Sequence, residues 1–366
     1  MNRTQRPNLT SRPARTDGPR NFAGTSLRKF LPILALPFAI AVQAEPAFYQ
    51  GSIGDKIGFS IEVDPADSHT AGTVTYDTTG ADGLILEVTP GRPCGLPWKE
   101  SLYSRVNGQT KPTGVFNGSL SNDAKTAEGI WTSSDGKKTL PYKLTRTARM
   151  LEIKSNVVDA KATYPEIEGP RYSQLNKLLT DEAKHHQDAN IDWVKETQKE
   201  LQEVTPPKEG VSAVFRWRLA RLESVSDGLV SLSYRNAEFE GGAHPNTIFS
   251  GINYQIAVDG TPKRLELWDL LNKTDANIQT ISDLLIKDLK RQNATYIKDG
   301  SVKHFKNSLG TDGVAFVILP SGIAFIFSQY EVGPYAEGDF RVVVPYSKLA
   351  SALRADGPLA HSAAKP

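Results

Sequence analysis

The sequence predicts an α+β protein in which an N-terminal all-β module precedes a mixed module of strands and two main helices. Short segments of alternating apolar residues fill 47–148, and none of them has helical spacing. Residues 172–203 contain neither glycine nor proline and carry apolar residues at three- and four-residue steps, which indicates a long helix. Strands and one further helical stripe follow. Since helices and strands do not alternate strictly, a doubly wound parallel sheet is not expected.

The first module, residues 47–148, is predicted to be an antiparallel β-meander or a small barrel. Apolar residues alternate with polar or small ones over 57–63, which is the period of a half-buried strand. Asp135-Gly136 is a tight-turn signal between two further strands, at 129–132 and 140–144.

The second module, residues 160–350, is predicted to combine an antiparallel sheet with the helices. The long helix should end before Pro206-Pro207. The remaining expected elements are a hairpin (215–219 with 230–234), a helix with the apolar stripe Ile278, Ile281, Leu285 and Leu289 capped by Thr274 or Asp275, an apolar hairpin (314–327), a last strand (341–344), a short helix (346–353) and a loose tail (355–366).

Charge and cysteine content narrow the possible partners. Residues 1–44 hold seven of the 43 basic residues and one of the 41 acidic residues, so 36 basic and 40 acidic residues remain. The slight excess of acidic residues after position 44 argues against a nucleic-acid partner. The single cysteine, Cys94, excludes an intramolecular disulfide and is read as an ordinary small side chain or an incidental thiol.

Residues 1–44 are predicted to be a polar extension followed by a signal peptide. Arg28-Lys29 precedes an apolar run of 13 residues at 30–42, and Val42 and Ala44 supply small residues at −3 and −1. The run is shorter than the roughly 20 residues that span a bilayer, and a short buried helix is the alternative. Residues 1–26 are either a disordered extension or lie upstream of a start at Leu27. The expected location is the periplasm or outside the cell, with no membrane anchor in the mature chain.

Four segments of the second module carry a resemblance to a known family. They are Tyr-Pro-Glu-Ile at 164–167, Phe-Glu-Gly-Gly-Ala-His at 239–244, the strand-turn-strand at 253–267, and residues 325–346. Their order and spacing resemble an extracytoplasmic domain over residues of about 160–350. This domain is shared by the sigma-V anti-sigma factor, whose outer part binds lysozyme, and by a peptidoglycan deacetylase that carries it beside its catalytic domain (the RsiV/PdaC-like domain). The resemblance implies lysozyme or peptidoglycan as the partner.

Two departures limit what the resemblance implies. The sequence shows no transmembrane helix with a cytoplasmic sigma-binding segment, so transmembrane signalling is not carried over. It also has no Asp-Asp pair or His-x-x-x-His, so deacetylation is not carried over. Residues 49–54, 129–131 and 135–141 of the first module resemble a β-rich domain of secreted bacterial proteins, which implies location and fold rather than activity.

Two loops hold the candidate binding residues. His244 follows Gly241-Gly242, which allow a sharp turn, and the alternative is a loop histidine bonded to backbone. Tyr330, Glu331, Tyr335 and Glu337 occupy a Gly-Pro loop, where aromatic rings and carboxylates suit contact with a sugar or a protein. No catalytic residue, metal site or cofactor is predicted. The adjacent His185 and His186 point about 100° apart on a helix and cannot chelate one metal.

The sequence therefore predicts an exported, non-catalytic binding protein of the bacterial cell envelope. Two other interpretations remain open. One is a periplasmic immunity or inhibitor protein, and the other is a cell-envelope hydrolase that uses Glu331 or His244.

Overall fold

The computed structural model describes residues 46–54, 56–63, 72–77, 84–88, 96–104, 109–204, 214–226, 228–309 and 313–362. The predicted signal peptide, the extension before it and Cys94 lie outside these residues. Among the helices in the described part of the chain, none is long and apolar enough to cross a membrane.

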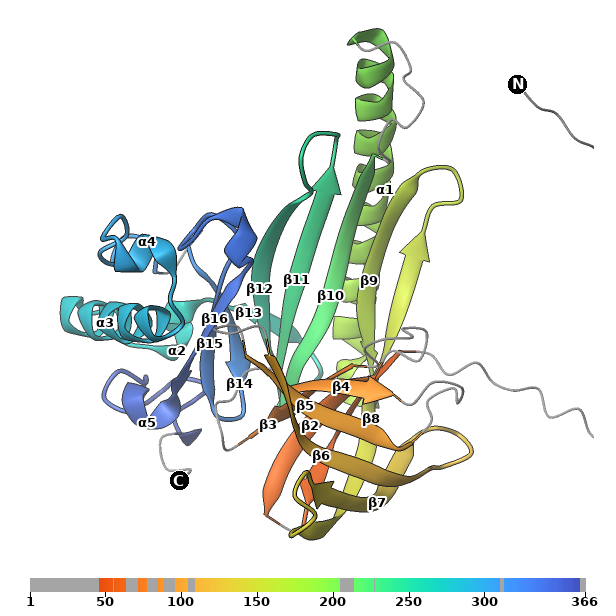
Figure 1. Cartoon of the computed structure of the whole chain (residues 1–366), viewed down its shortest axis with the longest axis vertical. Helices are drawn as coiled ribbons and strands as arrows, with labels where there is room; N and C mark the ends of the chain where they lie inside the picture. The colour runs from red at the N-terminus through yellow and green to blue at the C-terminus, as the bar shows by residue number, and fades with distance from the viewer. Residues whose placement is uncertain are drawn as a thin grey trace, which may run out of the picture. The chain divides into compact units, whose positions relative to one another are not determined.

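The predicted antiparallel meander of the first module is confirmed (Figure 1). Each strand pairs with the next one along the chain, and the first also pairs with the eighth. Its core contains the fully buried rings of Phe59, Trp98 and Phe116. The strands are β1 (Ala47–Ile53), β2 (Ile57–Val63), β3 (Gly72–Tyr76), β4 (Leu84–Val88), β5 (Trp98–Ser104), β6 (Gln109–Leu120), β7 (Thr126–Ser133) and β8 (Thr139–Lys154).

Strand β8 joins the two predicted modules. It pairs with β1 and β7, and its later residues pair with β9 (Asp159–Ile167). It runs without interruption through residue 148, the predicted end of the first module. The described strands β1 to β13 consequently form one hydrogen-bonded sheet in sequence order.

The long predicted helix is confirmed as α1 (Ser173–Val204), which follows the 3-10 turn η1 (Pro170–Tyr172). Leu175 and Leu179 are buried between this helix and the sheet. The sheet continues with β10 (Phe215–Ser226), β11 (Leu229–Phe239), β12 (Asn246–Ile256) and β13 (Pro262–Leu265).

One strand pair of the second module differs from the predicted antiparallel arrangement. Strands β9 and β10 are parallel over four residue pairs, from Phe215 opposite Asp159 to Arg218 opposite Ala162. The reason is α1, because a helix that connects two neighbouring strands returns the chain to the end where the first strand began. The β10–β11 hairpin is antiparallel as predicted.

The C-terminal part forms a separate three-stranded antiparallel sheet with helices around it (Figure 1). All six residues of its middle strand are buried, as the apolar hairpin predicted. The elements are α2 (Leu267–Leu270), α3 (Asp275–Arg291), α4 (Thr295–Lys298), β14 (Ala315–Leu319), β15 (Gly322–Phe327), η2 (Tyr335–Glu337), β16 (Phe340–Pro345) and α5 (Tyr346–Leu349).

Two local expectations for this part have different outcomes. Thr274 caps α3 by accepting a hydrogen bond from the Asn277 N–H, as predicted. The prediction of a loose tail is wrong for residues 355–362, because Leu359 is 2% exposed and packs into the same core as α3 and β15.

Strand β14 lies against the large sheet through side-chain hydrogen bonds. A Cβ at Gly251 on β12 would lie 2.0 Å from the Phe316 carbonyl oxygen, so only glycine allows this approach. Buried Asn253 donates to the same oxygen at 3.1 Å. The Ile318 N–H donates to the Ser231 hydroxyl at 2.7 Å. These two backbone groups of the buried edge strand are therefore satisfied by side chains of the large sheet.

A buried ion-pair network joins three strands. Glu223 on β10 is 3% exposed, and its two carboxylate oxygens accept from the Arg341 guanidinium at 3.0 Å each. Ser233 donates to the same carboxylate at 2.6 Å. Arg221 lies 3.8 Å from Glu223 and 3.6 Å from Glu62 on β2. Burial alone would raise the pKa of Glu223, but Arg341 and Arg221 lower it to about 2.

Candidate functional site

The loop between β11 and β12 presents His244 to solvent. Gly241 and Gly242 have φ values of 98° and 106°, the left-handed conformations that two glycines were expected to supply. The His244 Nδ1 atom lies 3.1 Å from the Pro245 carbonyl oxygen. Because a carbonyl oxygen only accepts, this contact places the ring proton on Nδ1 and leaves Nε2 as an acceptor. The backbone contact of the alternative interpretation is thus present, but it is only one of the contacts of His244.

The turn after β15 holds Tyr330 in an unusual backbone conformation. Its φ is 71°, a left-handed value that non-glycine residues seldom adopt. The turn is closed by the Ser328 N–H, which donates to a Glu331 carboxylate oxygen at 2.8 Å. The Ser328 hydroxyl accepts from the Phe249 N–H at 3.0 Å and so ties the turn to β12. Tyr330 is 52% exposed.

Three of the five predicted residues meet and form what we name the aromatic cluster: His244, Tyr330 and Tyr335. The rings of His244 and Tyr335 are stacked, with centroids 3.6 Å apart and planes inclined by 16°. The Tyr330 hydroxyl lies 3.1 Å from Nε2 of His244 and donates to it, as the tautomer requires. The centroids of Tyr330 and Tyr335 are 6.1 Å apart. Segments 86 residues apart in the chain therefore build one aromatic surface.

The predicted carboxylate Glu337 has a different environment. One of its oxygens accepts from the Thr295 N–H at 3.2 Å and the other from the Thr295 hydroxyl. Thr295 is the first residue of α4, so the carboxylate holds the beginning of this short helix. Glu337 thus stabilises the fold next to the aromatic cluster.

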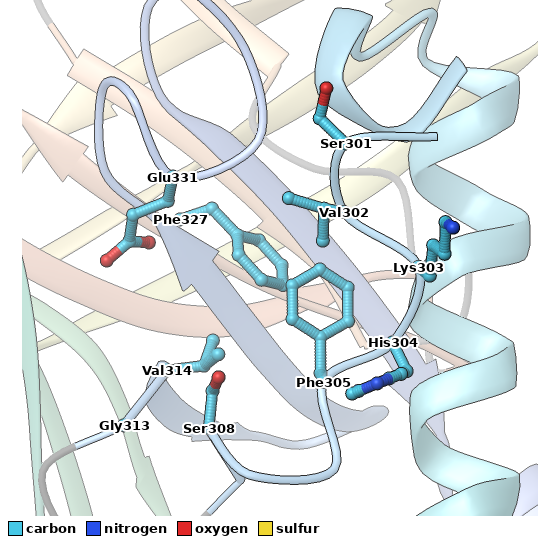
Figure 2. A pocket seen from close by; sticks show the side chains of 10 residues that line it. All are labelled: Ser301, Val302, Lys303, His304, Phe305, Ser308, Gly313, Val314, Phe327 and Glu331. Carbon is cyan, nitrogen blue, oxygen red and sulfur yellow. The ribbon is translucent and has the colours of Figure 1, made fainter. Parts of the chain in front are cut away.

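The second predicted carboxylate, Glu331, lines a pocket of about 690 Å³ (Figure 2). Partial burial of its carboxyl raises the pKa of Glu331, and the hydrogen bond from the Ser328 N–H opposes that rise. Glu331 is the only carboxylate among the described residues that line this pocket. The two loop carboxylates therefore lie in different surroundings.

The described residues contain no group of three or more His, Cys, Asp or Glu side chains that could hold a metal ion. The rings of His185 and His186 are 6.0 Å apart on α1. His185 is exposed and His186 is half-buried. Burial, with the Arg218 charge as the next cause, lowers the pKa of His186 to about 4.

Sequence reasoning missed a buried carboxylate in the first module. Glu100 on β5 is 2% exposed and accepts from Tyr76 at 2.8 Å, Trp131 at 2.8 Å and Thr113 at 2.9 Å. The sequence does contain a hint of this burial: Glu100 lies two positions after Trp98, so both side chains are on the same face of a strand. Three donors stabilise the carboxylate inside the module.

Two family comparisons match consecutive segments of the second module. Residues 151–247 match the family described as deacetylase PdaC, and residues 268–347 match a family described as a protein of unknown function (DUF3298). A search of the curated proteins finds no match.

Two crystal structures of DUF3298 family proteins are similar to this chain. The protein from Pseudomonas aeruginosa PAO1 is 15% identical, and the match covers 57% of this chain and 93% of that one with a TM-score of 0.37. The protein from Bacteroides fragilis NCTC 9343 is 16% identical, and the match covers 60% and 98% with a TM-score of 0.37. The family matches to residues 151–247 and 268–347 confirm the resemblance to a PdaC-like domain that the sequence indicated over about 160–350.

Proposed function

We propose that this protein is an exported, non-catalytic binding protein of the bacterial cell envelope and that the aromatic cluster is its contact surface. The stacked pair of His244 and Tyr335 carries the proposal, because a solvent-facing aromatic stack loses little conformational entropy on binding and offers a large flat contact area. Tyr330 extends this area and is held there by a strained turn, a feature that concentrates at functional sites.

The partner that best fits this surface is peptidoglycan, whose sugar rings present flat C–H faces to aromatic side chains. Lysozyme is the protein partner implied by the resemblance of the second module. Both partners require the chain to act outside the cytoplasm, which agrees with the predicted signal peptide. Calorimetric titration with soluble peptidoglycan fragments and, separately, with lysozyme distinguishes the two.

Replacing His244 by alanine is expected to weaken binding of the partner by roughly tenfold or more, because it removes one ring of the stack and the acceptor of the Tyr330 hydroxyl. His185→Ala is the matched control, since His185 is also exposed but lies on α1. The control should bind like the wild-type protein. Failure of the wild-type protein to bind either partner would exclude both specific versions of the proposal.

Export is tested on the protein purified from cells. Mass spectrometry of the periplasmic fraction should show a chain that begins at Glu45, directly after the small residues Val42 and Ala44. A product with its N-terminus intact in the cytosolic fraction would contradict the location and, with it, the envelope partner.

A further inference from the structure

A row of aromatic rings crosses β10 and β11 and ends at a lysine on β9, the neighbouring strand (Figure 1). The Phe215 ring is stacked on Trp217, with centroids 4.2 Å apart and planes inclined by 20°. Its centroid lies 5.9 Å from that of Phe239 on β11. The Lys161 Nζ atom on β9 lies 4.4 Å from the centroid of the Trp217 ring. We name these four side chains the ring row. All of them are half-buried, so each keeps some contact with solvent.

The ring row lies on the face of the sheet that is turned away from α1. Side chains alternate between the two faces along a strand, so Arg216 points away from its neighbours Phe215 and Trp217. The Arg216 guanidinium lies over the Trp193 ring of α1, 5.0 Å from the ring centroid. Helix α1 therefore covers the opposite face, and the half-buried rings remain accessible on theirs.

The surface around the ring row carries an excess of positive charge. Arg235 on β11 is exposed and lies opposite Leu219, two positions along β10 from Trp217 and thus on the same face. In the described part of the chain, neither Lys161 nor Arg235 forms an ion pair. The carboxylate of Asp159 accepts a hydrogen bond from the Trp217 indole N–H at 2.8 Å and so holds the orientation of this ring. Two cations and one carboxylate therefore surround the rings.

The ring row adjoins the aromatic cluster. Phe239 ends β11 one position after the last pair of the β11–β12 hairpin, whose member on β12 is Asn246. His244 lies two positions before Asn246, so the register of the hairpin places it next to the Phe239 end of the row. On the same face, Phe249 lies opposite Arg235 and packs against β14 and β15. The ring row and the aromatic cluster are therefore neighbouring parts of one side of the sheet.

We propose that the ring row is a second contact surface and that its occupant is an acidic glycan, a chain of sugar rings that carries carboxylates. The C–H groups of the sugars would pack along the aromatic rings, and the carboxylates would pair with the Lys161 ammonium and the Arg235 guanidinium. A basic protein such as lysozyme would be repelled by the same two cations. The inference rests on the proposed envelope function and deepens it, since it names the chemical class of the partner.

The probe is a pair of soluble oligosaccharides of equal length, titrated calorimetrically into the full-length protein. One alternates N-acetylglucosamine with N-acetylmuramic acid and so carries a carboxylate on every second sugar, and the other is a neutral chitin oligosaccharide. The acidic one should bind about tenfold more tightly, the effect of a charge-assisted hydrogen bond, and the difference should shrink at high salt. Equal affinities would overturn the proposal, and so would tighter binding of a single-stranded oligonucleotide.

Lys161→Met removes the charge but keeps an unbranched side chain next to Trp217. This variant should bind the acidic oligosaccharide about tenfold more weakly and the neutral one as the wild-type protein does. Lys184→Met is the matched control, since Lys184 is exposed on α1. The control should bind both oligosaccharides like the wild-type protein. Unchanged binding of the acidic oligosaccharide by Lys161→Met would contradict the proposal.

A comparison of Trp217→Ala with His244→Ala separates this inference from the proposed function. Trp217→Ala should weaken both oligosaccharides, because it removes the central ring of the row. If only His244→Ala weakens binding, the inference fails and the aromatic cluster stands as the contact surface. If only Trp217→Ala does, the ring row stands and the aromatic cluster fails. If lysozyme binds and neither oligosaccharide does, the inference fails and the protein partner of the proposed function remains.

Discussion

Replacing Glu223 by alanine is expected to lower the free energy of unfolding by about 3–5 kcal/mol. The change removes the carboxylate that accepts two guanidinium bonds from Arg341, whose side chain is 17% exposed. It also leaves the Ser233 hydroxyl without this acceptor in a buried position. Urea denaturation followed by circular dichroism measures the loss as a shift of the midpoint at constant slope.

Glu238→Ala is the matched control for this measurement. Glu238 pairs with Arg216 at 3.4 Å on the same sheet, but both side chains are about one-third exposed, at 34% and 38%. Pairs near the surface contribute about 0–1 kcal/mol, so this variant should stay close to the wild-type protein. Equal effects of the two substitutions would show that burial of the Glu223 network does not set its contribution.

Acidification is expected to remove the contribution of the same carboxylate, by roughly 3 kcal/mol between pH 4.5 and pH 2. The folded-state pKa of Glu223 is about 2, below the ordinary value of 4.5. Between these two values the unfolded chain binds a proton that the folded protein does not, so the free energy of unfolding falls as the pH falls. The full contribution is present above about pH 4.5.

The pH effect is isolated by comparison with Glu223→Gln, whose amide does not titrate. The difference between the unfolding free energies of the wild-type protein and this variant should shrink steadily from pH 5 to pH 2. The other carboxylates contribute equally to both proteins and cancel. Parallel curves for the two proteins would contradict a lowered pKa at Glu223.

The arrangement of the site was partly predictable from local patterns. The two glycines before His244 indicated a sharp turn, and the Gly-Pro loop after an apolar strand indicated an exposed position for Tyr330 and Tyr335. The sequence could not show that these two loops meet, because no periodicity encodes the distance between segments 86 residues apart. The sequence also could not show that Glu331 and Glu337, which are six positions apart, lie in different surroundings.

By itself, the sequence determined the class of the fold and the elements whose signals are local: the meander, the helix α1, the capped helix α3 and the buried hairpin of β14 and β15. Each depends on a period or a cap read within about 30 residues. The tertiary structure decided the parallel pairing of β9 with β10, the continuity of β8, the burial of Leu359 and the partner of Glu223. Arg341 lies 118 positions from Glu223, and only the packing of the second sheet on the first brings a charge there that makes a buried carboxylate stable.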